Sequence, residues 1–192
     1  ELDVRDVPAM RNRLETVAQQ VGEIDILVNN AGYEQVCPSY ELTEETWDTI
    51  METNLKGAFF AAQVAAHSMV RSSRGGAIVN VCSLTSYVGV PTAVPYGSSK
   101  SGLLGMTRAL STEWASEQIR VNAIAPGYFR TELTESFYRE QTWQEAMLQK
   151  IPLNSFGNAN DLKGAVVFLV SDAAKYITGQ CLAIDGGYLA SI

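Results

Sequence analysis

The sequence predicts an α/β fold in which helices cover a parallel sheet. Four short apolar runs, at residues 24–29, 77–81, 119–124 and 181–184, are typical of strands buried on both faces. Helical patterns of roughly 10 to 20 residues alternate with these runs, which indicates βαβ units. There is no internal repeat or low-complexity tract, so we expect a single domain over residues 1–192.

Helix-terminal residues place the helices between these strands. The first helix is expected over residues 8–21, with Pro8 in its first turn and Gly22 after its end. Thr43 is the predicted N-cap of a second helix that runs to about residue 71, since Glu44 and Glu45 suit the positive end of the helix dipole. Two further helices are expected at about residues 95–114 and 161–169.

The composition argues against several classes of function. Lys and Arg number 14 against 21 Asp and Glu, a net charge of −7, which disfavours a nucleic-acid partner. No apolar run reaches the length of a membrane-spanning helix. Three distant cysteines (Cys37, Cys82, Cys181) form neither a disulfide framework nor a zinc site, and the single His67 makes a histidine-ligated metal site improbable. We therefore expect a protein without metal in a reducing cytoplasm.

Tyr96 and Lys100 form the first candidate catalytic pair. A spacing of four residues puts both side chains on one face of the helix that begins near residue 95. A free tyrosine has a pKa of about 10, and a cation one turn away favours the phenolate and lowers that pKa. The pair therefore suits acid–base chemistry, although such a spacing also arises by chance.

Other small and polar residues follow the predicted strands. Asn29-Asn30-Ala31-Gly32 comes directly after the first strand, where small residues let a ligand approach the backbone. Ser83 follows the second strand, and Asn54 interrupts a helical pattern. Pro126-Gly127 and Asp185-Gly186-Gly187 end the third and fourth strands. Each of these motifs, taken alone, is explained as well by a turn, a kink or a strand end.

Residues 128–156 form a long, aromatic segment after the third strand. Because ligands bind at the carboxyl ends of parallel strands, this segment is predicted to be a substrate lid. The alternative is a pair of amphipathic helices that pack in an oligomer.

Taken in order along the chain, these motifs resemble the short-chain dehydrogenase/reductase family, of the type with an Asn-Ser-Tyr-Lys tetrad. Ser83 lies thirteen residues before Tyr96, which is the family's interval, and the resemblance covers essentially all 192 residues. The sequence is most similar to the branch with 3-oxoacyl-carrier-protein reductases and glucose or gluconate dehydrogenases. The resemblance implies a three-layer, Rossmann-type, doubly wound parallel sheet. It also implies an oxidoreductase that uses NAD or NADP to transfer a hydride to or from a carbonyl or secondary alcohol.

The resemblance implies a role for each matching residue. Tyr96 would be the general acid or base, Lys100 would lower its pKa and hold the nicotinamide ribose, and Ser83 would bind the substrate carbonyl. Asn54 would expose a helix carbonyl that holds a water of the proton relay. The implied cofactor-binding residues are Asp3, Val4, Asn29, Ala31, Gly32, Tyr96, Lys100, Pro126, Gly127 and Thr131. The implied partners are a small-molecule substrate and further copies of the chain, in a dimer or tetramer.

The sequence departs from the family pattern in two places. Ser155 stands where relatives usually carry Arg, and no glycine-rich phosphate loop occurs, since no two of the 15 glycines are separated by a single residue. We therefore expect an N-terminally truncated fold without the first two βα units, and an open edge at the strand 24–29. The alternative function is a non-catalytic core that cannot bind cofactor and acts only in oligomer packing. An extended relative that epimerises sugar nucleotides fits less well.

Overall fold

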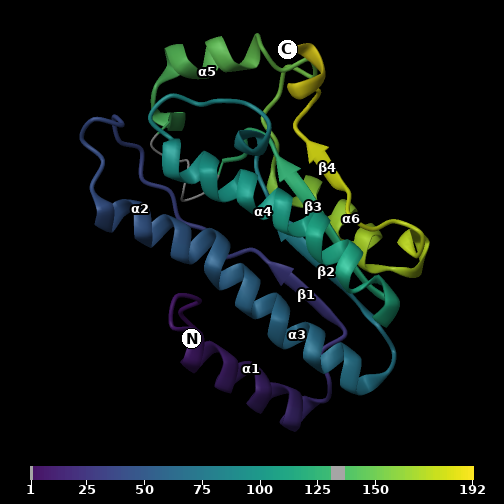
Figure 1. Cartoon of the computed structure of the whole chain (residues 1–192). Coiled ribbons are helices and arrows are strands. Elements are labelled where there is room, and N and C mark those ends of the chain that lie inside the picture. Colours follow the sequence, from purple (N-terminus) through teal and green to yellow (C-terminus); the bar gives the residue numbers. More distant parts are fainter. Residues whose placement is uncertain (1, 131–136) are drawn as a thin grey trace.

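A four-stranded parallel sheet organises the structure, a computed structural model that describes residues 2–130 and 137–192 (Figure 1). The strands lie in the order β1-β2-β3-β4 and all pair in parallel. Their bounds are Ile26–Asn29, Gly76–Val81, Ile119–Pro126 and Cys181–Ile184. The predicted α/β class and parallel sheet are therefore confirmed, with strand ends within two residues of those expected.

Helices cover both faces of this sheet, so the fold has three layers (Figure 1). The α-helices of the described residues are α1 (Val7–Val21), α2 (Glu44–Met51), α3 (Ala58–Ser72), α4 (Val94–Glu113), α5 (Gln141–Leu148) and α6 (Ala159–Val170). Ile78 and Val121 pack against α3 and α4, whereas Val79 and Ile124 pack against α6. This alternation follows from the two-residue period of a strand, and it explains why the strand sequences are apolar throughout.

Two predicted helix starts are confirmed by their caps. The Asp6 side chain accepts a hydrogen bond from the Ala9 N–H at the start of α1, and Thr43 accepts one from the Thr46 N–H at the start of α2. The helix expected to run from Thr43 to about residue 71 is interrupted, however, by a π-helical segment at Glu52–Gly57. Gly57 is required there, because a Cβ atom would lie 2.8 Å from the carbonyl oxygen of Val4.

Strand β1 lies at one edge of the described sheet and pairs only with β2. Two of its apolar side chains, Ile26 and Val28, are 50% and 40% exposed. The expected open edge is thus present, and it is the kind of surface that another strand or chain usually covers. Within the described residues, no helix is long and apolar enough to cross a membrane.

Candidate active site

The predicted site residues gather at the carboxyl ends of the strands. Parallel strands end at the same edge of a sheet, so the segments that follow β1, β2, β3 and β4 meet there. Gly127 allows the ends of β3 and β4 to approach closely. Its N–H donates to the Ile184 carbonyl at 2.9 Å, and a Cβ atom at this position would lie 2.7 Å from the Cα of Asp185.

Tyr96 and Lys100 lie on one face of α4, as their spacing predicts. Lys100 is only 3% exposed, its Nζ donates a hydrogen bond to the Val81 carbonyl at 2.7 Å, and it lies 5.6 Å from the centroid of the Tyr96 ring. The Ser83 side chain also acts on the Tyr96 phenol and favours its phenolate form. Three predicted catalytic side chains from two separate elements are therefore brought together.

The pKa of Tyr96 shifts in the direction opposite to the one expected from its neighbour Lys100. Burial raises the pKa of Tyr96, the negative charge of Glu34 raises it further, and the hydrogen bond with Ser83 only partly opposes this rise. Burial also lowers the pKa of Lys100 to about 8. Lys100 was expected to lower the pKa of Tyr96, but desolvation of the phenol is the largest influence and raises this pKa instead, because a charged phenolate is costly away from water.

Asn54 is fully buried in the π-helical segment and clamps the chain after β1. Its Oδ1 accepts a hydrogen bond from the Tyr33 N–H at 2.7 Å, and its Nδ2 donates to the Tyr33 carbonyl at 2.9 Å. Nδ2 also donates to the Ser99 hydroxyl at 3.0 Å, and that hydroxyl donates to the carbonyl of Tyr96. Asn54 therefore joins the segment after β1 to the turn that carries Tyr96. The predicted water-binding role of its backbone carbonyl stays a prediction.

The Asn29 side chain forms hydrogen bonds with buried groups of the protein itself. It is 9% exposed, and its Nδ2 donates to the Ala58 carbonyl at 3.0 Å and to Asn80 Oδ1 at 2.9 Å. Asn80 in turn donates to the Thr107 hydroxyl at 2.9 Å, so a row of buried amides ties β1, β2, α3 and α4 together. Asn80 was not among the predicted site residues, although a polar residue within an apolar strand is a signal of such a network.

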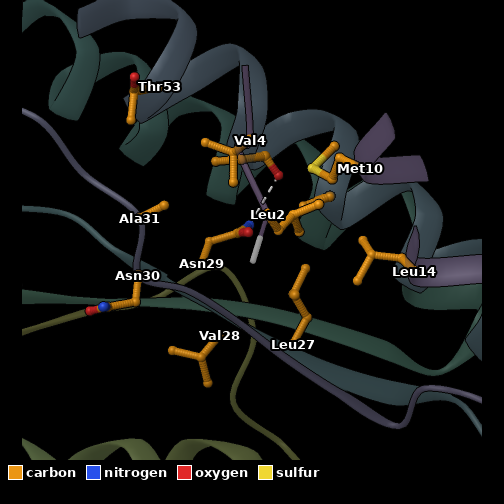
Figure 2. Close-up of a pocket in the computed structure, with 12 residues that line it drawn as sticks. Leu2, Val4, Met10, Leu14, Leu27, Val28, Asn29, Asn30, Ala31 and Thr53 are labelled. Carbon is orange, nitrogen blue, oxygen red and sulfur yellow. Dashed lines mark hydrogen bonds between the residues drawn. The ribbon is translucent and has the colours of Figure 1, made fainter. Parts of the chain in front are cut away.

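A pocket of about 150 Å³ lies beside the end of β1 (Figure 2). Its walls include Val4 and the segment 29–31, and the other lining residues are mainly apolar, among them Met10 and Leu27. Val4, Asn29 and Ala31, three of the predicted cofactor-binding residues, thus line one pocket, and their role in binding the cofactor stays a prediction. Ser83 and Tyr96 are not among the residues that line this pocket. Asp3 is exposed nearby, and an ion pair with Arg5 at 2.8 Å lowers its pKa.

Gly32 lies beside the Lys100 ammonium and the Asn54 side chain. A Cβ atom there would meet Lys100 Nζ at 3.7 Å and Asn54 Oδ1 at 3.8 Å, which are ordinary contacts. The packing of the chain itself therefore tolerates a side chain at this position, and glycine keeps the space beside the Lys100 ammonium open. An ammonium has three N–H donors, and one of them is directed to Val81. The others suit ribose hydroxyl groups, so these residues fit the expected cofactor. Thr131 lies outside the described residues.

Several aromatic residues in the described parts of the segment 128–156 pack against one another. Tyr138 lies 4.8 Å from Phe156 and 5.3 Å from Trp143 between ring centroids, and Tyr128 contacts both Trp143 and Tyr188. This cluster follows the carboxyl end of β3 and includes α5 (Figure 1). Its position suits the predicted lid, which stays a prediction.

Comparison with known proteins relates the whole chain to oxidoreductases. A family model described as enoyl-(acyl carrier protein) reductase matches residues 1–189. The 2-dehydro-3-deoxy-D-gluconate 5-dehydrogenase of Escherichia coli (strain K12) is 39% identical over 188 residues, which cover 98% of this chain and 74% of that protein. The 3-oxoacyl-(acyl-carrier-protein) reductase FabG of Thermotoga maritima is 40% identical over 186 residues, covering 97% and 74%.

Solved structures agree with this relationship. A candidate short-chain alcohol dehydrogenase from Sinorhizobium meliloti 1021 superposes with a TM-score of 0.95 at 63% identity, over 99% of this chain and 75% of that one. A gluconate 5-dehydrogenase from Burkholderia cenocepacia J2315, in complex with NADP and tartrate, gives a TM-score of 0.97 at 34% identity, over 100% and 74%. The fold is therefore the Rossmann-type fold that the resemblance implies.

Proposed function

We propose a function from the premise that this chain belongs to the short-chain dehydrogenase/reductase family. It is an NAD(P)-dependent oxidoreductase that acts on the carbonyl or alcohol group of a small molecule. What we add is the assignment of roles to its residues. The observation that carries this assignment is the position of the buried Lys100 Nζ, 5.6 Å from the centroid of the Tyr96 ring on the same face of α4, with Ser83 acting on the phenol.

In carbonyl reduction, Ser83 donates a hydrogen bond to the carbonyl oxygen and Tyr96 donates the proton that this oxygen takes up. The bound cofactor supplies the hydride. Lys100 places a positive charge beside the Tyr96 ring, and this charge stabilises the negative charge that proton transfer leaves on the phenolate. Alcohol oxidation uses the same groups in reverse, with Tyr96 as the base.

The proposed cofactor site runs from the pocket beside β1 to the end of β3. Val4, Ala31 and the backbone near Asn29 would border the adenosine half, with Asp3 at its edge. Gly32 and Lys100 would lie beside the nicotinamide ribose, and Pro126 and Gly127 would border the nicotinamide, with Thr131 assigned by the resemblance alone. The relatives solved with bound NADP support the choice of cofactor.

We also propose that the protein forms a homo-oligomer in the cytoplasm. Apolar side chains on β1 and α6 are exposed, including Ile26 at 50% and Val167 at 63%, and contact between chains would cover such surfaces. Cys37, Cys82 and Cys181 are free thiols, which suits a reducing compartment. The relatives named above are enzymes, so they lend no support to the alternative of a non-catalytic packing unit.

The test of the proposed function is Tyr96→Phe. This variant keeps the ring but lacks the proton, so carbonyl-dependent oxidation of NADH or NADPH should fall by about 100-fold or more, while cofactor binding followed by fluorescence stays within about twofold of wild type. Tyr176→Phe is the matched control, because Tyr176 is fully exposed and distant from the site. Near wild-type rates for Tyr96→Phe across a panel of aldehydes, ketones and keto acids would exclude Tyr96 as the proton donor.

A further inference from the structure

A second pocket, of about 660 Å³, lies between α4 and the segment that leads into β4. Its lining includes Arg108 and Thr112 of α4, residues 178–181, and Tyr87. A pocket of this volume can hold a small organic molecule, since sites for such ligands usually measure about 300–1,000 Å³. None of the four proposed catalytic residues lines it, so it is separate from the proposed catalytic site.

The segment before β4 is held in place by β3. The Gly179 N–H donates to the Val121 carbonyl at 2.8 Å, and the Val121 N–H donates to the Thr178 hydroxyl at 3.1 Å. Gly179 has a φ of +72°, and a Cβ atom there would lie 2.7 Å from Ser111 Oγ, so glycine lets this segment approach α4 closely. The wall of the pocket is therefore formed before a ligand arrives, which lowers the entropic cost of binding.

Arg108 gives this pocket a positive charge. Among the described residues no Asp or Glu lines the pocket, although acidic residues outnumber basic ones by 21 to 14 in the whole chain. Arg5, Arg71 and Arg74 each form an ion pair, whereas the guanidinium of Arg108 has no carboxylate partner in the described part of the chain. A guanidinium carries five N–H donors in a planar fork that matches the oxygens of a carboxylate or a phosphate. This fork is therefore available to a ligand.

Neutral side chains of the lining complement this charge. The Gln180 Nε2 donates one hydrogen bond to the Thr178 carbonyl at 3.3 Å, which leaves its second N–H for a ligand. Tyr87 is 45% exposed and adds an aromatic ring to the lining, and such a ring can stack on another planar, apolar group. The lining therefore combines donors for an anionic group with a surface for an apolar one.

We propose that this pocket is a binding site for a small organic anion, whose carboxylate or phosphate group binds Arg108 and whose apolar body rests on Tyr87. The free N–H of Gln180 donates a further hydrogen bond to the anionic group. The ligand is not the reacting carbonyl compound, because the proposed catalytic residues lie outside the pocket.

Benzoate, phenyl phosphate and benzamide test this proposal, because they share one aromatic ring and differ in the charge and shape of the attached group. Titration calorimetry should detect binding of at least one of the two anions, and the tighter one identifies a carboxylate or a phosphate as the preferred group. Arg108→Gln should weaken that binding by about tenfold or more, and neutral benzamide should bind more weakly by a similar factor. Arg13→Gln is the matched control, because it removes the same charge from an exposed position of α1 and should change the affinity by less than about twofold.

Alkylation of Cys181 by iodoacetamide shows whether the anion occupies this pocket, since Cys181 belongs to its lining. The pKa of this thiol is lowered to about 7, by Cys82 most of all, while burial opposes the shift and Tyr87 and the charge of Arg108 lower the pKa further. A bound anion covers the thiol and disfavours its thiolate. The alkylation rate of Cys181, followed by peptide mass spectrometry, should therefore fall by about fivefold or more at saturating anion. Cys37 lies outside the pocket and should react at its original rate.

Four results would overturn the proposal. They are no binding of either anion up to about millimolar concentration, equal affinity for benzamide, binding that Arg108→Gln leaves unchanged, and no protection of the pocket thiol at saturating anion. If Cys181 itself does not react with iodoacetamide, Thr112→Cys places a second thiol at an exposed position of the lining, and protection is measured there. These measurements require no turnover, so their outcome is independent of the proposed function.

Discussion

Replacing Asn54 by Ala should destabilise the protein by about 2–3 kcal/mol. Three hydrogen bonds of this fully buried side chain are lost, and each contributes about 0.5–1.5 kcal/mol net. We expect less than three times the largest contribution of a single bond, for two reasons. Water can reach the backbone of Tyr33, which is 38% exposed, and Ser99 keeps its bond to the Tyr96 carbonyl.

Urea unfolding followed by circular dichroism measures this loss as a lower midpoint at an unchanged slope. Asn12→Ala is the control, because Asn12 is exposed on α1 and its substitution should change the free energy of unfolding by no more than about 0.5 kcal/mol. A midpoint for Asn54→Ala equal to that of Asn12→Ala would show that the clamp on Tyr33 contributes nothing to stability, and the argument from its hydrogen bonds would then be wrong.

Two further predictions concern backbone packing and pH. Gly127→Ala should lower the free energy of unfolding by about 1–3 kcal/mol, since its Cβ atom would lie 2.7 Å from Asp185 Cα, whereas Gly105→Ala, with open space in the middle of α4, should raise it by up to about 1 kcal/mol. Thermal unfolding of both variants distinguishes them, and equal shifts would contradict the contact. Lys100 has a folded pKa of about 8, below its unfolded value of 10.5, so the unfolded state binds more protons between these values. The free energy of unfolding of wild type should therefore rise relative to that of Lys100→Met between about pH 8 and pH 10. Urea denaturation of both proteins at several pH values measures this difference. If the two free energies of unfolding change with pH in the same way, the reasoning is wrong.

Features that depend on neighbours in the sequence could be predicted from the sequence. Thr43 caps α2 because an N-cap needs only a hydroxyl group and the N–H three residues on. Tyr96 and Lys100 share a helix face because four residues make about one turn. The strands could be placed because residues such as Val79 and Val121 continue an apolar run that both faces of the sheet bury.

Features that depend on distant contacts could not be predicted. The π-helical segment at Glu52–Gly57 fits where Val4 approaches Gly57 and Asn54 reaches Tyr33, and no local pattern shows either contact. The bond between Asn29 and Asn80 joins two strands whose register the sequence does not specify. The direction of the pKa shift of Tyr96 was missed for the same reason, because it depends on burial and on Glu34 rather than on the nearby Lys100.

The order in which Tyr96 and Lys100 titrate bears on the direction of the reaction. Burial lowers the pKa of Lys100 to about 8 and raises that of Tyr96 above its usual value, so Lys100 gives up its proton first as the pH rises. Tyr96 therefore stays protonated at neutral pH, which is the state that carbonyl reduction requires of a proton donor. Alcohol oxidation needs the phenolate, and Glu34 opposes its formation. Because these three groups interact, any measured pKa of the reaction belongs to the cluster rather than to Tyr96 alone. The site as built therefore favours proton donation, and alcohol oxidation requires further positive charge beside the phenol or a higher pH.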